Sequence, residues 1–84
     1  MPTSLQYSVY VLESLKDHKN YVGLSSNIKA RFFAHNAGKV TSTRSRRPFI
    51  IIHEELVGPL VEARKREKYF KSAAGKRFLQ LLKS

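Results

Sequence analysis

The first part of the chain alternates short apolar runs with polar stretches in a pattern typical of a β-hairpin. Residues 7–12, YSVYVL, are rich in β-branched and aromatic side chains, and YVGL begins at Tyr21 after the polar stretch ESLKDHKN. The pattern predicts two strands joined by a connection of about six to eight residues.

The next segment, SSNIKARFFAHNAGK, predicts a short helix. Ile28 and Phe32 recur at positions i and i+4, which places both on one helix face. Gly38 suits the C-terminal end of this helix, where a left-handed residue is common. Three residues at the start offer side-chain oxygens for an N-cap: Ser25, Ser26 and Asn27.

The stretch VTSTRSRRP is polar, basic and broken by Pro48, so it predicts a loop. The third strand follows as FIIIHEEL, and the uninterrupted apolar run 49–52 predicts that this strand is covered on both faces.

Gly58 and Pro59 predict the end of this strand and the start of a helix, since proline suits the first helical turn. We expect that helix to run to about Ser72. After Ala73, Ala74 and Gly75, the segment GKRFLQLLK predicts a final short helix. The predicted order is β-β-α-β-α-α, an α/β protein of the α+β type, in a single domain over residues 1–84.

The composition fits one small, soluble, cytoplasmic domain. A chain of 84 residues with 42% hydrophobic residues supports one compact core. The chain contains no cysteine, which excludes a disulfide framework and a thiolate metal site. The apolar run 49–52 is too short to span a membrane, and MPTSLQ lacks the features of a signal peptide.

The charge indicates a polyanionic partner. The formal net charge is +10, and basic domains bind nucleic acid by releasing condensed counterions. We favour nucleic acid over an anionic membrane surface, because no segment combines a wide apolar face with a basic face over about 20 residues. No acid occurs between Asp17 and Glu54, where seven cations accumulate: Lys19, Lys29, Arg31, Lys39, Arg44, Arg46 and Arg47.

Glu67 stands alone among basic neighbours and has two interpretations. Leu60, Ala63 and Phe70 fall within about 60° of it on a helical wheel, so Glu67 lies on the apolar side of its helix. In the first, Glu67 forms an ion pair with Arg64 or Lys71, worth about 0.2–0.5 kcal/mol. In the second, its carboxylate is a ligand for a metal ion. Since a carboxylate at the core-facing edge of a helix loses favourable hydration, and ion pairing does not explain why no other acid lies nearby, both interpretations stay open.

Two further groups have both a structural and a functional interpretation. Arg31 and His35, four residues apart, project from one helix face and are either a surface basic pair or groups that bind a phosphate and transfer a proton. Tyr10 and Tyr21 meet across neighbouring strands, with Gly23 leaving room for a close approach, and are either packing residues or site residues.

Together these segments form a recognisable series. SVY at 8–10, ten intervening residues, YVG at 21–23, then NIKARFFAHNAGK and KREKYF follow one another in order. In this arrangement the chain resembles the GIY-YIG nuclease superfamily over nearly its whole length, in particular small stand-alone members akin to the N-terminal domain of the excinuclease C subunit. The departure is Ser8-Val9-Tyr10 in place of Gly-Ile-Tyr.

The resemblance implies a three-stranded antiparallel sheet flanked by helices and a metal-dependent endonuclease site. By position it assigns catalytic roles to Tyr10, Tyr21, Arg31, His35 and Glu67, with Glu67 holding Mg²⁺ or Mn²⁺ and Gly23 as the motif glycine. Tyr10 is the expected general base, helped by His35. The residues expected to bind nucleic acid are Lys39, Thr43, Arg44, Arg46 and Arg47.

The expected substrate is branched or nicked DNA, cut according to its structure, in the context of DNA repair and with a protein partner supplying any sequence specificity. The alternative is a non-catalytic nucleic-acid-binding module or partner subunit that keeps the same fold.

Overall fold

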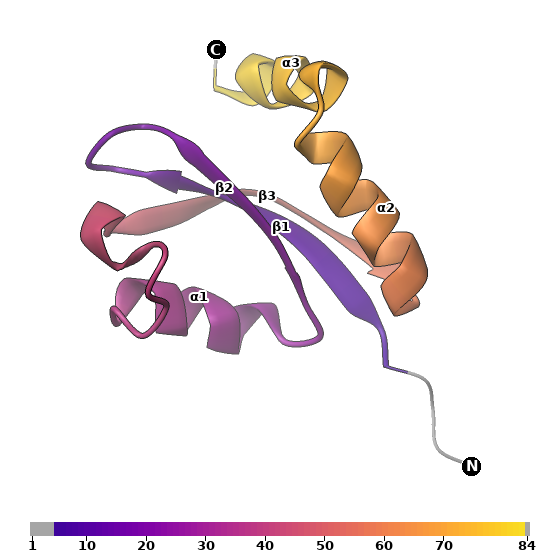
Figure 1. Cartoon of the computed structure of the whole chain (residues 1–84), viewed down its shortest axis with the longest axis horizontal. Helices are drawn as coiled ribbons and strands as arrows, with labels where there is room; N and C mark the ends of the chain where they lie inside the picture. Colours follow the sequence, from indigo (N-terminus) through magenta and orange to yellow (C-terminus); the bar gives the residue numbers. More distant parts are fainter. Residues whose placement is uncertain (1–4, 84) are drawn as a thin grey trace.

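The protein is built on a three-stranded antiparallel sheet in the order β2-β1-β3 (Figure 1). In the computed structural model, which describes residues 5–83, the strands are β1 (Tyr7–Ser14), β2 (Asn20–Ser25) and β3 (Phe49–Gly58). The predicted sheet is confirmed. The connection between the first two strands, residues 15–19, is shorter than predicted because β1 continues through Glu13 and Ser14.

Three α-helices and a short 3₁₀ turn complete the predicted order β-β-α-β-α-α. They are α1 (Ile28–Asn36), η1 (Arg44–Arg46), α2 (Leu60–Phe70) and α3 (Ala73–Leu82).

Side-chain caps set two of the helix starts. The side chain of Asn27 accepts a hydrogen bond from the Ala30 amide, which selects Asn27 among the three predicted N-caps of α1. The Ser72 side chain accepts from the Gly75 amide, so α3 already begins at Ala73 and α2 ends at Phe70, earlier than predicted. Gly38 follows α1 with φ of 80°, as expected for a helix end.

The two faces of the sheet pack against different helices. Because side chains alternate along a strand, Val9 and Val11 face one way and Tyr10 and Leu12 the other. The valines join a buried cluster with three residues of α2 and α3: Ala63, Phe70 and Leu79. Tyr10 and Leu12 join Phe49 in a second cluster, against which Ile28 and Phe32 of α1 pack.

The apolar run at the start of β3 contributes to both clusters. Ile51 packs on the α1 side and Ile52 on the α2 and α3 side, so the prediction of a strand covered on both faces is confirmed for these two residues. It is wrong for Ile50, which is 42% exposed, because β3 is an edge strand and the helices do not reach that position.

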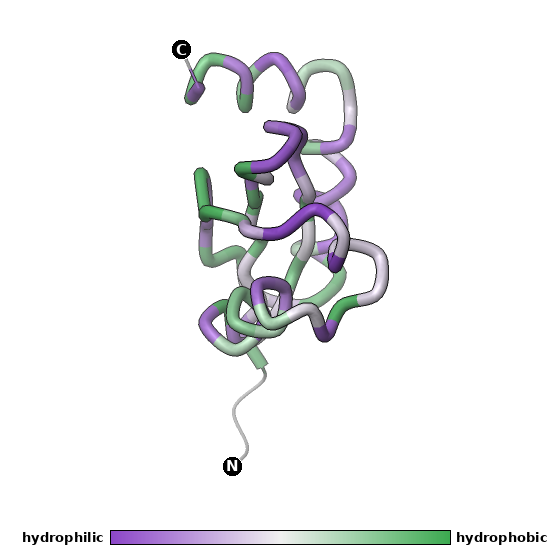
Figure 2. The backbone as a smooth tube through the Cα atoms, turned by 90° about the vertical axis from the view of Figure 1, so that its left-hand side faces the viewer, coloured by the Kyte–Doolittle hydropathy of each residue, from purple (hydrophilic) through white to green (hydrophobic). Residues whose placement is uncertain are grey.

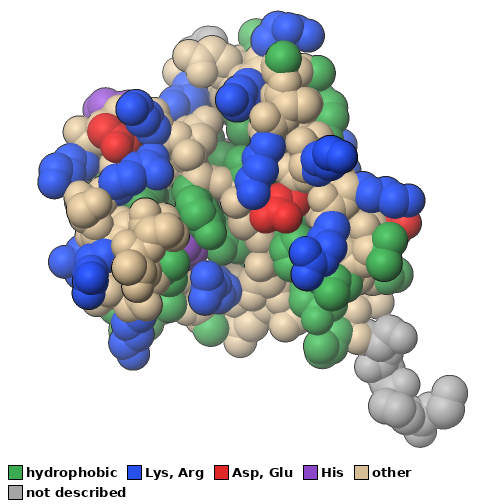
Figure 3. All heavy atoms as spheres, in the orientation of Figure 1, with side chains coloured by type: hydrophobic (Ala, Val, Ile, Leu, Met, Phe, Trp, Pro, Cys, Tyr) green, Lys and Arg blue, Asp and Glu red, His purple; other side chains and the backbone are tan. Residues whose placement is uncertain are grey.

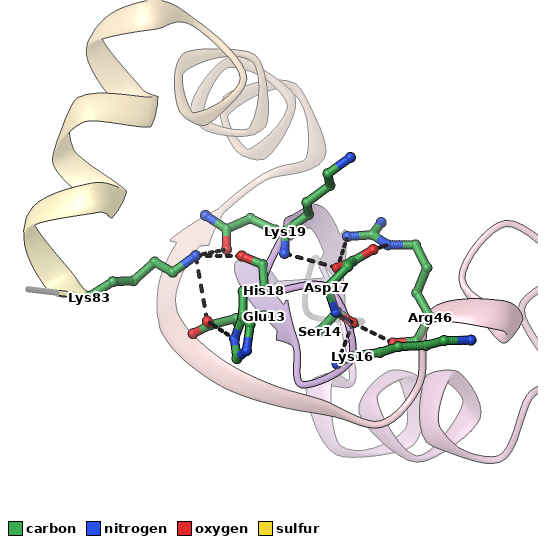
Figure 4. Close-up of polar contacts among 9 residues, drawn as sticks. Glu13, Ser14, Lys16, Asp17, His18, Lys19, Arg46 and Lys83 are labelled. Carbon is green, nitrogen blue, oxygen red and sulfur yellow. Dashed lines mark hydrogen bonds and ion pairs between the residues drawn. The ribbon is translucent and has the colours of Figure 1, made fainter.

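Polar contacts hold the β1–β2 turn between two distant segments (Figure 4). On one side, Lys83 Nζ, just beyond α3, donates to the His18 carbonyl and lies 3.6 Å from Glu13 Oε2. On the other side, Arg46 Nε donates to Asp17 Oδ2 at 3.0 Å. The turn thereby contacts both the end of α3 and the loop of residues 39–48 between α1 and β3, which we call the basic loop.

The amphipathic character of α3 is visible along the chain trace, where hydrophobic and hydrophilic positions alternate near the C-terminus (Figure 2). Its buried Leu79 faces the core while Leu81 is 73% exposed. Within residues 5–83, no helix is long and apolar enough to cross a membrane.

Candidate active site

A buried chain of hydrogen bonds links strand β1, helix α1 and the basic loop. The Tyr10 hydroxyl lies 3.0 Å from His35 Nε2, and His35 Nδ1 lies 2.8 Å from Thr43 Oγ1. All three side chains are buried, with relative exposures of 0–1%. The sequence analysis predicts roles for each of these residues but not their direct connection.

The direction of this chain follows from its last acceptor. Thr43 Oγ1 is 3.4 Å from the Val40 carbonyl, which only accepts, so the threonine hydroxyl donates there. Its oxygen is then free to accept from His35 Nδ1–H, which leaves Nε2 as the acceptor for the Tyr10 hydroxyl. In this network His35 is neutral, with its proton on Nδ1, and Nε2 can accept the phenolic proton of Tyr10.

The pKa shifts agree with that assignment. Burial, followed by the charge of Arg31, lowers the pKa of His35 below its ordinary value of 6.5, so the ring is neutral at pH 7. Burial raises the pKa of Tyr10 above its ordinary value of 10, with a hydrogen bond from Arg31 acting in the opposite direction. Tyr10 is therefore a protonated phenol in the metal-free protein.

Tyr21 and Gly23 complete the strand side of the site. Tyr10 is paired across the strands with Gly23, and the Tyr10 and Tyr21 rings lie diagonally with centroids 6.4 Å apart. The Tyr21 ring also contacts His35, at 4.9 Å between centroids. The predicted meeting of the two tyrosines is thus observed, and Tyr21 is half-buried where Tyr10 is enclosed.

Gly23→Ala is expected to disturb the site more than its single added methyl group suggests. A Cβ at position 23 would lie 2.6 Å from both Cζ and the hydroxyl oxygen of Tyr10, which a packed interior cannot accept without a shift. We expect a loss of about 1–3 kcal/mol in the free energy of unfolding, measured by denaturant titration, together with a weakened Tyr10–His35 contact. Unchanged stability and activity would show that the ring moves aside freely.

Glu67 reaches the same region from α2. Its side chain is 24% exposed and Oε2 lies 3.3 Å from Lys71 Nζ, so the structure contains the predicted ion pair with Lys71. The charges of Arg31 and Glu67 both act on the Tyr10 phenol, Arg31 more strongly. All five predicted catalytic side chains therefore come from β1, β2, α1 and α2 into one electrostatically connected site.

The environment of Glu67 is compatible with a hydrated divalent cation. Its carboxylate is half-buried and already has a cationic partner, the Lys71 ammonium, which a metal ion would replace. Magnesium commonly uses one or two protein carboxylates and keeps water or phosphate oxygens as its other ligands. Within residues 5–83 no group of three or more His, Cys, Asp or Glu side chains gathers to hold a metal.

The basic loop contains three exposed cations, one paired arginine and one buried threonine. Lys39, Arg44 and Arg47 are exposed, whereas Arg46 is held by Asp17. Thr43 is fully buried and holds His35, so its side chain is unavailable for the DNA contact expected of it. In the space-filling view, Lys and Arg side chains lie on both sides of an indented area where hydrophobic side chains are exposed (Figure 3).

Asn36 has a supporting role that the sequence analysis missed. Its side chain donates to the Phe49 carbonyl at 3.1 Å and accepts from the Phe49 amide at 2.7 Å, which fixes the end of α1 to the start of β3. This contact holds His35, the preceding residue, at a fixed position over the sheet. The neighbouring sequence HNAG gave a helix-end signal only.

Comparison with known proteins agrees with this arrangement of residues. The model of the GIY-YIG catalytic domain matches residues 6–80. The chain belongs to the GIY-YIG family. A UPF0213 protein of Syntrophus aciditrophicus is 40% identical over 77 residues, covering 89% of this chain and 87% of that protein.

Two other relatives of this GIY-YIG chain are of similar length. A UPF0213 protein of Staphylococcus haemolyticus is 32% identical over 78 residues, covering 92% of this chain and 94% of that protein. One from Clostridium perfringens is 36% identical over 77 residues, covering 90% and 82%. No solved structure gives a significant match. Membership of the GIY-YIG family connects the site to nuclease chemistry in general.

Proposed function

We propose that this protein is a divalent-metal-dependent endonuclease that hydrolyses DNA phosphodiester bonds and selects its substrate by structure rather than by sequence. The observation that carries the proposal is the buried Tyr10–His35–Thr43 chain beside Arg31 and Glu67. A buried tyrosine hydroxyl needs a hydrogen-bond partner, and the partner here is an imidazole that can also accept the phenolic proton. The direct test is whether cleavage of labelled DNA requires a metal and stops in EDTA.

The roles follow from the geometry. Tyr10 takes a proton from the attacking water as its own proton passes to His35 Nε2, which is positioned to accept it at 3.0 Å. Thr43 keeps His35 in the required tautomer. The half-buried Tyr21, whose ring centroid lies 6.4 Å from that of Tyr10, orients the water or the phosphate.

Arg31 and Glu67 act on the phosphate. The guanidinium of Arg31 forks onto phosphate oxygens and stabilises the charge that develops there. A Mg²⁺ or Mn²⁺ ion bound by Glu67 would neutralise phosphate charge and polarise a bound water. The expected substrate is branched or nicked DNA, and a partner protein is expected to supply any further specificity.

A non-catalytic DNA-binding role is the second candidate. The net charge of +10 and the exposed cations of the basic loop support binding by themselves. The two candidates differ in one measurable respect, because a binding module has no use for the proton-accepting state of His35.

The acid side of the pH–rate profile is expected to depend on His35. Because the pKa of His35 is lowered, the ring is neutral at pH 7 and available to accept the phenolic proton, and bulk solvent protonates it only below its ordinary value of 6.5. We expect kcat/KM to fall on acidification with a midpoint below 6.5, and His35→Gln to lose most activity. His18→Gln, whose side chain is 70% exposed, should leave the profile unchanged. A midpoint above 7 would contradict the neutral His35.

The basic loop is expected to bind phosphates without reading bases. Replacing Arg44, Arg46 and Arg47 with Ala should weaken binding to all sequences alike. The slope of log K against log salt is negative, and its magnitude should fall by about two units. Two are expected because Arg46 is already paired with Asp17 at 3.0 Å. An unchanged slope in anisotropy titrations would place the binding surface elsewhere.

A further inference from the structure

A groove lies directly beside the candidate site, on the outer edge of the sheet. Its volume is about 310 Å³, which is within the range of sites for small ligands. Tyr21 and Val22 of β2 line one side, and Phe70 and Leu79 of α2 and α3 line the other. The lining is mostly apolar although the groove is open to solvent.

Two features connect this groove to the reaction centre. Tyr21 lines the groove and also contacts Tyr10 and His35. Lys71 lines the groove as well, and its Nζ lies 3.3 Å from the Glu67 carboxylate. A molecule in the groove would therefore contact Lys71, the ion-pair partner of Glu67, and Tyr21, the neighbour of Tyr10.

The opposite end of the groove opens into a cationic hollow. This second hollow, of about 430 Å³, shares Asn20 and Lys76 with the groove and has two further lysines in its lining, Lys19 and Lys83. Lys83 is engaged with Glu13 and the β1–β2 turn (Figure 4), whereas no carboxylate within residues 5–83 pairs with Lys19 or Lys76. The sequence of surfaces is thus reaction centre, apolar groove, cationic hollow.

This alternation matches the chemistry of a single nucleic-acid strand. A strand presents a phosphate, then a flat apolar base face, then the next phosphate, and single-strand binders combine apolar or aromatic seats with cationic tracks. An uncharged peptide or lipid with an apolar group would satisfy the groove but not the lysines at its rim and in the hollow. Charge complementarity therefore favours an anionic occupant, and the alternation of phosphate and base favours a nucleic-acid strand.

Resting on the proposed nuclease function, we propose that this groove seats one unpaired base of the DNA strand, next to the phosphate bound by Arg31. The half-buried Tyr21 and Val22 contact the base, with the buried Phe70 and Leu79 behind them, and Lys76 contacts the following phosphate. This makes an unstacked nucleotide, as at a nick, bulge or branch point, a structural feature that the protein recognises. An uninterrupted duplex is expected to be a poor substrate, because its stacked bases do not enter the groove.

The test is equilibrium binding in EDTA, where no cleavage is expected to complicate the signal. Labelled duplexes carry a single bulged thymidine, the same bulge as an abasic residue, or no bulge. We expect the bulged base to bind about tenfold more tightly than the abasic bulge. Val22→Trp fills the groove and should abolish this difference, whereas Val61→Trp, at a site 64% exposed on α2, should preserve it.

A measurement on the unaltered protein covers the case in which Val22→Trp does not fold. A bulged 2-aminopurine should become severalfold less accessible to acrylamide quenching when the protein binds, and a paired 2-aminopurine should not change. Lys76→Gln should weaken base and abasic bulges equally. Equal affinity for base and abasic bulges, or unchanged quenching, overturns the proposal.

The outcomes separate the groove from the nuclease. Metal-dependent cleavage without preference for the bulged base supports the nuclease function and rules out the base-binding role of the groove. Preference for the bulged base in EDTA, without cleavage under any metal, supports the base-binding role and rules out the nuclease function.

Discussion

Glu67→Gln is expected to abolish cleavage while leaving DNA binding as tight as in the parent, or tighter. The substitution removes the carboxylate that would hold the metal and adds one unit of positive charge to a protein that binds a polyanion. It also removes the ion pair with Lys71, but an exposed helical pair of this spacing is worth only about 0.3–0.5 kcal/mol. Folding should therefore be preserved, which circular dichroism and thermal unfolding would verify.

Glu62→Gln is the matched control. Glu62 is also on α2 and also pairs with a lysine, Lys65 at 3.4 Å, but its side chain is 56% exposed. Single-turnover cleavage and anisotropy titrations on both variants separate chemistry from binding. If Glu67→Gln cuts at the parental rate, the ligand assignment is wrong and the Lys71 pair is the whole role of Glu67.

Tyr10→Phe is expected to lower the cleavage rate by about 10²–10⁴, the usual effect of a positioned acid or base, with DNA affinity nearly unchanged. The ring keeps its packing beside Gly23, but His35 Nε2 loses its partner in a buried position. Such an unpaired group costs about 1–3 kcal/mol, which a domain of this size tolerates. The expected variant is folded, less stable and almost inactive.

Tyr69→Phe provides the comparison, because Tyr69 is 37% exposed on α2 and its ring contacts Arg66 rather than the site. It should leave cleavage and stability close to the parental values. Near-parental cleavage by Tyr10→Phe would move the base role to His35 or to a metal-bound hydroxide. A variant that fails to fold would show that the hydroxyl is structural.

Much of the fold was predictable because local signals agree with one another. The short β-branched and aromatic runs predicted the strands, and the caps and breakers predicted the helices between them. Which face of β1 meets which helix is seen only in the structure, where Val9 and Val11 face α2 and α3 and Tyr10 and Leu12 face α1. The helix wheel placed Glu67 on the apolar side of α2, and its half-buried position agrees. Boundaries were less predictable, since the Ser72 cap moves the start of α3 by a contact that periodicity does not describe.

The connections within the site were not predictable from the sequence. The His35–Thr43 contact depends on the path of the loop between them, which contains no hydrophobic period. The Asn36–Phe49 pair likewise joins segments on either side of that loop. The groove is formed by β2, α2 and α3 together, so it exists only once three separated segments have packed.

One cleavage assay tests directly whether the protein is a metal-dependent nuclease that requires Glu67. Parent and Glu67→Gln, purified in parallel, are incubated with labelled junction, flap, nicked and single-stranded DNA in Mg²⁺, Mn²⁺ or EDTA. We expect the parent to cleave the branched or nicked substrates in the presence of a metal, and we expect no cleavage in EDTA or by the variant. Binding of these substrates without cleavage under any metal, or equal cleavage by the variant, would contradict this expectation.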